Sequence, residues 1–326
     1  MKKEIAVFGL GRIGRHLVRE ILRLDQIRHI EINDLNSDLD NICYLLNYDS
    51  VYGYRSERFI NKLSHIYCTE TEKKVFFRAV DSIESKIVID STGSPDFLAN
   101  LSKLSHFSKI YVTHTPKHNI DEYIIANVSK NSAGRIVSTS ICDTTAIAPL
   151  LLFLDNNYGI DSGHVTTLHP WLNYQNLSDS SIISTDIPSN YWSDYALGRK
   201  STENIIPKST SAISALGMVF PSLSKKINSW SFRVPTPVVS TALLNINLDS
   251  PISSENKILE SFEHINGVTI SGLNLTSSDY IGLPYNCAVD RKSISVRNNN
   301  LYISLWYDNE LGYVQNIISF IKGDVA

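Results

Sequence analysis

The feature that most constrains the fold is a glycine pattern near the amino terminus. Gly9, Gly11 and Gly14 have the G-x-G-x-x-G spacing, directly after an apolar run at residues 4–8 and at the beginning of a helical pattern. In a β-α-β unit the first glycine makes the tight turn, the second admits a pyrophosphate and the third lets the helix pack against the strand. Asp34 follows Gly14 by 20 residues, where a carboxylate binds a ribose hydroxyl and repels a 2′-phosphate. These residues predict a Rossmann domain that binds NAD.

The periodicity of the remaining chain predicts a second domain of another kind. At about 150 residues per domain, 326 residues correspond to roughly two domains. The first half alternates short strands with helices, which is typical of a parallel sheet; the expected strands are 4–8, 29–32, 75–77, 86–90, 110–113 and 135–138. From about residue 160, longer alternating runs predict an α+β domain with a mostly antiparallel sheet; they are 165–168, 242–248, 267–271 and 301–306.

We therefore expect an α/β protein in which a doubly wound NAD-binding domain comprises residues 1–141 and 309–326. The catalytic and oligomerisation domain is expected at residues 142–308. Helical spacing from 309 to 321 predicts a final helix that returns to the first domain.

Charge and composition exclude several classes of function. Lys and Arg number 30 against 33 Asp and Glu, so no global positive field attracts nucleic acid or anionic lipid. The longest nearly apolar run, at residues 146–154, is shorter than the roughly 18 residues that span a bilayer. The four cysteines are too scattered for a disulfide framework, and none has zinc-site spacing to another Cys or His. We expect a cytoplasmic protein with a small-molecule substrate, no nucleic-acid or membrane partner and no metal.

A candidate nucleophile lies at Cys142, between the end of a predicted strand and the beginning of an apolar helical pattern. The amino terminus of a helix stabilises a thiolate, so this position predicts a lowered pKa and a nucleophilic sulfur. A thiolate enzyme also needs a base. His169 ends the next predicted strand 27 residues later, whereas the other eight histidines lack such a motif partner.

With these motifs, the chain resembles the phosphorylating glyceraldehyde-3-phosphate dehydrogenase family, which includes the erythrose-4-phosphate dehydrogenases. The resemblance runs through nearly the whole chain in ordered blocks: GLGRIGR at 9–15, INDL at 32–35, YDSV at 48–51, DSTG at 90–93, TTLH at 166–169, NIIP at 204–207, FRVPTP at 232–237 and WYDNE at 306–310. Cys142 and His169 also match the family's spacing from catalytic cysteine to histidine.

The resemblance implies NAD-dependent aldehyde oxidation. In that chemistry the Cys142 thiolate adds to the aldehyde, His169 takes the hydroxyl proton, and hydride transfer to NAD leaves a thioester. In the main branch of the family, inorganic phosphate then accepts the acyl group. A homotetramer with contacts through the catalytic-domain sheet is also implied. The positions that match cofactor contacts of the family are Arg12 and Ile13 in the glycine loop, Thr113 near the ribose, Asn309 at the nicotinamide carboxamide and Tyr313 beside the ring.

The site for the attacking phosphate departs from the family pattern. The family has Ser-Cys-Thr where this chain has Ile141, Cys142 and Asp143, so an alkyl group and a carboxylate replace two hydroxyls that bind phosphate. Two unit charges about 4 Å apart interact by roughly 4 kcal/mol at an effective dielectric of 20, so Asp143 would repel phosphate. The family's Thr-Gly pair in this site appears here as Thr210 and Ser211.

The site for the substrate phosphate departs as well. Leu172 and Tyr174 stand where the family has two threonines, and Arg233 is the retained anion ligand. Three hypotheses follow. The chain is a diverged phosphorylating enzyme, an enzyme with another aldehyde and with water or an amine as acyl acceptor, or an idle NAD-binding paralogue with a regulatory role. In the second, Asp143 orients or deprotonates the acceptor.

Overall fold

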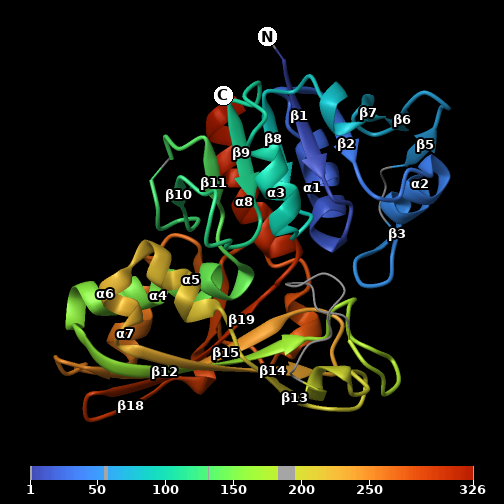
Figure 1. The fold of residues 1–326 in the computed structure, drawn as a ribbon. Helices are drawn as coiled ribbons and strands as arrows, with labels where there is room; N and C mark the ends of the chain where they lie inside the picture. The colour runs from blue at the N-terminus through green and yellow to red at the C-terminus, as the bar shows by residue number, and fades with distance from the viewer. Residues whose placement is uncertain (1, 55–57, 131, 183–194, 326) are drawn as a thin grey trace. The chain divides into compact units, whose positions relative to one another are not determined.

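The computed structural model describes residues 2–54, 58–130, 132–182 and 195–325, in two compact units (Figure 1). The first unit contains Met1–Ile124, Ser129–Ser140 and Val314–Ala326, and the second contains Ile125–Val128 and Ile141–Tyr313. Each unit has its own sheet. None of the helices in these described ranges is both long enough and apolar enough to span a membrane.

The first unit is built on a nine-stranded sheet with the order β10-β11-β9-β8-β1-β2-β7-β6-β5. Its strands are β1 (Lys3–Phe8), β2 (Ile27–Asn33), β5 (Phe59–Asn61), β6 (Ile66–Cys68), β7 (Lys73–Phe77), β8 (Ile87–Asp90), β9 (Lys109–Val112), β10 (Glu122–Tyr123) and β11 (Ile136–Ser138). From β10 to β7 all neighbouring strands are parallel. The last two pairs, β7–β6 and β6–β5, are antiparallel. The predicted parallel sheet is confirmed.

Helices and short elements complete this unit: α1 (Arg12–Leu22), α2 (Leu39–Asn47), α3 (Pro95–Leu101), the turn η1 (Val80–Ser82), the hairpin of β3 (Tyr48–Asp49) with β4 (Gly53–Tyr54), and most of α8 (Leu311–Val325). Leu17, Val18 and Ile21 of α1 are fully buried, because one face of the helix covers the sheet. Tyr111 on β9 donates a hydrogen bond to Asp324 of α8. This contact joins α8 to the first sheet, and Figure 1 shows α8 beside β9.

The second unit has an eight-stranded sheet with the order β13-β14-β12-β15-β19-β17-β16, to which β18 adds beside β19. Its strands are β12 (Ile160–Pro170), β13 (Ile206–Lys208), β14 (Ile227–Val234), β15 (Ser240–Leu248), β16 (Val268–Ser271), β17 (Cys287–Asp290), β18 (Ser295–Arg297) and β19 (Asn300–Tyr307). The β12–β14 and β16–β17 pairs are parallel, and the other strand pairs of this sheet are antiparallel. The expected mostly antiparallel sheet is therefore found.

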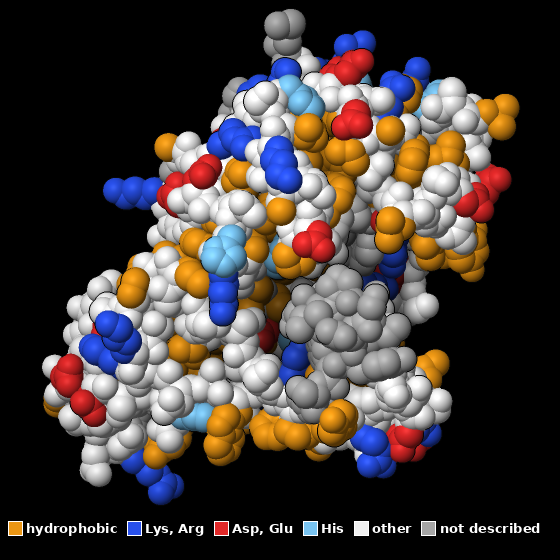
Figure 2. Space-filling view, in the orientation of Figure 1, with side chains coloured by type: hydrophobic (Ala, Val, Ile, Leu, Met, Phe, Trp, Pro, Cys, Tyr) orange, Lys and Arg blue, Asp and Glu red, His pale blue; other side chains and the backbone are white. Residues whose placement is uncertain are grey.

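The helices of this unit cover one face of its sheet (Figure 1). They are α4 (Cys142–Tyr158), α5 (Ala212–Val219), α6 (Pro221–Ser224) and α7 (Glu255–Phe262), with short turns η2 (Tyr195–Gly198), η3 (Ser277–Tyr280) and η4 (Arg291–Ser293). Along β15, Ala242, Leu244 and Ile246 are buried toward the helices. Because side chains alternate along a strand, the other face is left with exposed apolar residues. Trp230, Leu243 and Tyr302 are among them, and Figure 2 shows apolar side chains along the lower margin of the view.

Candidate active site

The glycine turn between β1 and α1 has a backbone that only glycine tolerates at two of its three positions. Gly9 has a φ of +82°, and a Cβ there would lie 2.9 Å from the Thr92 nitrogen. A Cβ on Gly14 would lie 1.8 Å from the carbonyl oxygen of Gly9. Gly11 differs, because a Cβ there would meet no atom within 4 Å. Space beside Gly11 is therefore available for a ligand to approach the backbone.

The surroundings of this turn fit a dinucleotide. Helix α1 has no side-chain cap at its Gly11 end, so first-turn N–H groups and the helix dipole are available to bind phosphate. A pocket of about 260 Å³ adjoins the turn, lined by Leu10, Gly11, Arg15, Asp34, Asn36, Ile42 and Leu45. The Asp34 carboxylate is held in place because it accepts hydrogen bonds from the Leu10 and Asn36 backbone nitrogens. Gly11, the α1 amino terminus and Asp34 would hold the pyrophosphate and a ribose.

The other predicted cofactor residues occupy several places. The Arg12 guanidinium pairs with Asp49, with Nη1–Oδ2 at 3.0 Å and Nη2–Oδ1 at 3.4 Å, so only the backbone of Arg12 belongs to the helix terminus. Ile13 is half-buried in the same first turn. Thr113 directly follows β9 and is also half-buried; its N–H donates to the Asp90 carbonyl at 3.0 Å. The glycines, Asp34, Arg12, Ile13 and Thr113 thus lie in the first unit.

Asn309 and Tyr313 belong to the second unit. Asp308 shapes their turn, because its Oδ1 accepts from the Glu310 and Leu311 nitrogens at 2.9 and 2.8 Å and its Oδ2 accepts from Gly282 at 2.7 Å. Asn309 and Tyr313 are each only 5% exposed. Within the described ranges, Oδ1 of Asn309 is buried without a hydrogen-bond partner. A buried carbonyl oxygen of this kind can accept a hydrogen bond from a ligand amide.

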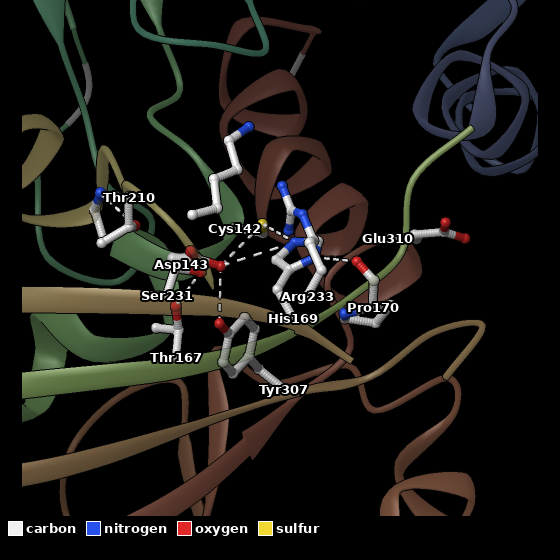
Figure 3. A network of polar contacts seen from close by, with 12 residues as sticks. Cys142, Asp143, Thr167, His169, Pro170, Thr210, Ser231, Arg233, Tyr307 and Glu310 are labelled. Atoms are coloured by element: carbon white, nitrogen blue, oxygen red, sulfur yellow. Dashed lines mark hydrogen bonds and ion pairs between the residues drawn. The ribbon is translucent and has the colours of Figure 1, made fainter. Parts of the chain in front are cut away.

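The predicted nucleophile and base face each other within the second unit. Cys142 begins α4, which has no side-chain cap, and its Sγ lies 3.7 Å from Nε2 of His169 near the end of β12. Nδ1 of His169 lies 2.8 Å from the Pro170 carbonyl oxygen. Because that carbonyl can only accept, Nδ1 carries the proton and Nε2 presents a lone pair to the thiol. Figure 3 shows this chain of contacts.

The electrostatics of the imidazole favour its neutral form. Burial, followed by the positive charge of Arg233, lowers the pKa of His169 to about 4, while Asp143 acts in the opposite direction. His169 and Arg233 are direct partners in the register between β12 and β14. Strand pairing therefore places a permanent cation beside the base.

Asp143 forms a direct part of the thiol's surroundings. The residue is 6% exposed, and its Oδ1 lies 3.5 Å from Sγ of Cys142 and 4.0 Å from Nε2 of His169. The Tyr307 hydroxyl donates to the same oxygen at 2.8 Å. These contacts, drawn in Figure 3, turn the carboxylate toward the cysteine and histidine.

The prediction of a lowered Cys142 pKa is wrong. Burial raises the pKa of the Cys142 thiol well above its usual value, the Asp143 carboxylate raises it further, and Arg233 only partly opposes them. The helix terminus is outweighed because a thiolate here would be poorly solvated and adjacent to another negative charge. The resting thiol is therefore protonated near neutral pH.

A second group of polar side chains surrounds Tyr174. Its hydroxyl lies 3.0 Å from Nζ of Lys208 and 3.4 Å from Nη2 of Arg233. Burial by itself would raise the pKa of Tyr174, but the charges of Arg233 and Lys208 lower it overall. Arg233 is 7% exposed and Lys208 is half-buried. Two cations thus converge on one hydroxyl group, which is an arrangement that can bind an anionic group.

The remaining predicted substrate residues flank these groups. Thr210 precedes α5, and its Oγ1 accepts from the Ala212 nitrogen at 3.1 Å. Thr144 in the first turn of α4 donates to the Ala212 carbonyl at 2.8 Å, which ties the two helix starts together. Ser211 is exposed at the start of α5. Leu172 is half-buried in the turn after β12, where its N–H donates to Gln175 at 3.1 Å.

Sequence reasoning missed Lys208 and Tyr307. Lys208 directly follows the NIIP block and precedes Thr210, so its position near an expected anion site was a usable signal. Tyr307 lies in the WYDNE block, but nothing local links it to Asp143, which is 164 residues away in the sequence. Only the packing of β19 beside β15 brings Tyr307 into the site.

Comparisons with known proteins match both parts of the chain. Residues 3–96 match the family model "Glyceraldehyde 3-phosphate dehydrogenase, NAD binding domain", and residues 141–309 match "Glyceraldehyde 3-phosphate dehydrogenase, C-terminal domain". The chain is 31% identical to glyceraldehyde-3-phosphate dehydrogenase of Priestia megaterium, over 99% of this chain and 98% of the relative. It is 30% identical to glyceraldehyde-3-phosphate dehydrogenase A of Escherichia coli, over 98% of both chains. It is also 30% identical to glyceraldehyde-3-phosphate dehydrogenase 1 of Caenorhabditis elegans, over 98% and 97%.

Proposed function

Because the chain belongs to the glyceraldehyde-3-phosphate dehydrogenase family of NAD-dependent oxidoreductases, we propose that it oxidises an aldehyde with an anionic tail and passes the acyl group to water. Cys142 is the nucleophile, His169 the base and acid, and Asp143 the base for water. The observation that carries this proposal is the Asp143 carboxylate, buried 3.5 Å from the cysteine sulfur.

The cofactor is NAD, and when bound it supplies the hydride acceptor, so that oxidation of the Cys142 adduct leaves a thioester. Gly11, the amino terminus of α1 and Asp34 would bind its pyrophosphate and ribose, which is supported by the pocket beside the turn. The unpartnered Oδ1 of Asn309 would accept a hydrogen bond from the carboxamide. Tyr313, which belongs to the same unit as Asn309, would lie beside the nicotinamide ring.

In the first step a carbon–sulfur bond forms between Cys142 and the aldehyde carbon. Nε2 of His169, 3.7 Å from the sulfur, takes the thiol proton and delivers it to the carbonyl oxygen, which gives a thiohemiacetal. During oxidation the same nitrogen takes the hydroxyl proton. The imidazolium that results is stabilised by Asp143, whose Oδ1 lies 4.0 Å from it.

In the second step Asp143 takes a proton from water as the water oxygen bonds to the thioester carbon. The carbon–sulfur bond breaks, the imidazolium of His169 returns its proton to the sulfur, and a carboxylic acid leaves. Asp143 then releases its proton to solvent, which restores the carboxylate. An attacking phosphate would instead meet the Asp143 carboxylate at close range. At about 4 Å, two like unit charges repel by roughly 4 kcal/mol at an effective dielectric of 20. This repulsion favours water over phosphate.

The anionic tail of the substrate is supported by the cations around Tyr174. Arg233 and Lys208 both reach the Tyr174 hydroxyl, and Arg233 is the strand partner of His169. An anionic group bound there would lie on the same side of the sheet as the base. A hydrogen bond to a charged group contributes about 1.5–3 kcal/mol, so the pair of cations would select strongly against uncharged aldehydes.

The test is a panel of aldehydes with phosphate, carboxylate or uncharged tails, each assayed by NADH formation with and without inorganic phosphate. We expect turnover of the anionic aldehydes without phosphate, and a free carboxylic acid as product. A strict requirement for phosphate with glyceraldehyde 3-phosphate would overturn the proposal and establish the phosphorylating enzyme. No turnover of any aldehyde, together with NAD binding, would favour the idle paralogue.

The substitution Lys208→Gln tests whether Lys208 and Arg233 bind the anionic tail of the substrate beside Tyr174. We expect KM for an anionic aldehyde to rise by roughly 10-fold or more, because one charge-assisted hydrogen bond is lost, while KM for an uncharged aldehyde stays the same. Lys226→Gln is the matched control, since Lys226 pairs with Asp155 away from the site. Equal effects of both substitutions would contradict the assignment of Lys208.

Assembly as a homotetramer is supported by the exposed apolar face of the second sheet, which carries Trp230, Leu243 and Tyr302. Exposed apolar side chains on one face of a sheet are typical of an interface. Sedimentation should give a tetramer, and Trp230→Glu should produce smaller species. A monomeric wild-type protein would contradict this part of the proposal.

A further inference from the structure

Three different metal-binding groups converge in the second unit. They are Sγ of Cys142, Oδ1 of Asp143 and Nε2 of His169, and one ligand atom from each lies within 4.8 Å of the others. The separations are 3.5 Å for sulfur to oxygen, 3.7 Å for sulfur to nitrogen and 4.0 Å for nitrogen to oxygen. Thiolate, imidazole and carboxylate are the ligands that zinc uses in proteins.

The triangle of donor atoms has nearly the size that a tetrahedral ion requires. Zinc binds sulfur at about 2.3 Å and nitrogen or oxygen at roughly 2.0–2.2 Å, so tetrahedral angles place nitrogen and oxygen about 3.5–3.7 Å from the sulfur and about 3.3–3.6 Å from each other. The two separations from sulfur already match. The third is longer by about half an ångström, which a small rotation of the Asp143 carboxylate can remove.

Charge and hydrogen bonding also suit a divalent cation. A Cys142 thiolate and the Asp143 carboxylate together carry two negative charges, which balance the ion. His169 directs Nε2 toward the sulfur, because Nδ1 bonds to the Pro170 carbonyl. Tyr307 donates to the Asp143 carboxylate. Outer hydrogen bonds of this kind hold ligands in orientation and strengthen binding. Arg233 opposes a cation and limits the affinity.

We propose that Cys142, Asp143 and His169 form a zinc site with water as the fourth ligand, and that Zn²⁺ bound there reversibly inhibits the enzyme. On binding, the thiol proton is released to solvent and the sulfur and Nε2 lone pairs bond to the ion. The metal then covers both nucleophile and base. The inhibition rests on the proposed function, whereas the binding does not.

Binding is tested with Co²⁺ added to the metal-free full-length protein. We expect one thiolate-to-cobalt charge-transfer band per chain, which stoichiometric Zn²⁺ abolishes and Cys142→Ser eliminates. His169→Asn and Asp143→Asn should each weaken binding at least about 10-fold, the lower end of what loss of an outer hydrogen-bond partner costs. Absence of the band, or equal affinity in Asp143→Asn and wild type, would overturn the proposal.

Two substitutions control for other ligands in the chain. Cys287→Ala removes a buried thiol outside the cluster, and Asp155→Asn removes a carboxylate at the far end of α4. Both variants should bind Co²⁺ as the wild type does. Loss of the band in Cys287→Ala, with circular dichroism unchanged, would place the site elsewhere and contradict the proposal.

The activity measurement separates this inference from the proposed function. In chelator the wild type should turn over aldehyde, and Zn²⁺ should inhibit it at concentrations at least about 10-fold lower than those that inhibit Asp143→Asn, each relative to its own rate in chelator. Turnover without metal binding would refute the zinc site and leave the function standing. Metal binding without turnover would refute the proposed function and leave the zinc site standing.

Discussion

In the first unit the candidate cofactor site is made mostly of main chain, whereas in the second the candidate catalytic site is made of side chains. The glycine turn, the uncapped start of α1 and the anchored Asp34 use backbone N–H groups and close backbone packing. The catalytic group gathers Cys142 from a helix, His169 and Arg233 from paired strands, and Tyr307 from β19.

This difference affects how each region can respond to substitution. A backbone site depends on a few glycines, and a Cβ at Gly9 or Gly14 would meet an immediate clash. A side-chain site can be rebuilt by one residue, because a new charge acts on every group around it. Asp143 is such a residue, since it contacts the thiol and the Tyr307 hydroxyl and lies 4.0 Å from the imidazole.

The largest expected effect tests the side-chain site. His169→Asn should lower kcat/KM by roughly 10²–10⁴, the usual contribution of general acid–base catalysis, because Nε2 is the proton acceptor beside Cys142. The affinity for NAD, measured by calorimetry, should stay within about twofold. Cys142→Ser, which removes the nucleophile, gives the background kcat/KM against which the His169 variant is compared. If His169→Asn were kinetically silent, the assignment of the base would be wrong.

The backbone site is tested with two glycines that should respond differently. Gly14→Ala should lower the free energy of unfolding by about 1–3 kcal/mol, as overpacking does, because its Cβ would lie 1.8 Å from the Gly9 carbonyl. Gly11→Ala should leave stability within about 0.5 kcal/mol yet weaken NAD binding about 10-fold or more, since its Cβ enters space left for the pyrophosphate.

Urea unfolding and NAD titration of both glycine variants give the comparison. Equal destabilisation by Gly11→Ala and Gly14→Ala would show that all three glycines serve only the turn. Unchanged NAD affinity in Gly11→Ala would place the pyrophosphate away from this turn.

The smallest effect concerns the pKa of Cys142. Asp143 raises that pKa and Arg233 lowers it, so Asp143→Asn should shift the pH profile of iodoacetamide labelling to lower pH, and Arg233→Gln should shift it to higher pH. Each pKa unit changes the thiolate fraction tenfold below the pKa, so labelling near neutral pH should change in opposite directions by up to about 10-fold. Shifts of the same sign would contradict these roles.

Much of the fold and part of the site could be predicted from local pattern. Strand and helix periodicity predicted both sheets because burial of one face imposes a period on the sequence. The G-x-G-x-x-G block and Asp34 predicted the NAD unit, since that site lies within one short β-α-β stretch. The pairing of Cys142 with His169 was likewise a sequence prediction, and the structure brings them within 3.7 Å.

What the sequence could not indicate is the electrostatic state of the thiol. A helix terminus predicts a lowered pKa from local geometry, but burial and the Asp143 carboxylate decide the opposite sign. The sequence likewise could not indicate that Tyr307 contacts Asp143, or that Lys208 and Arg233 both contact Tyr174. These contacts depend on strand order and register.

The sequence by itself therefore determined the family, the two-unit α/β fold and the NAD cofactor, because each depends on short motifs and on periodicity. Only the tertiary structure decided which charges surround Cys142 and which donor atoms lie within reach of one ion. The physical reason is that pKa values and coordination depend on distances of a few ångströms between residues far apart in the chain, and packing alone sets those distances.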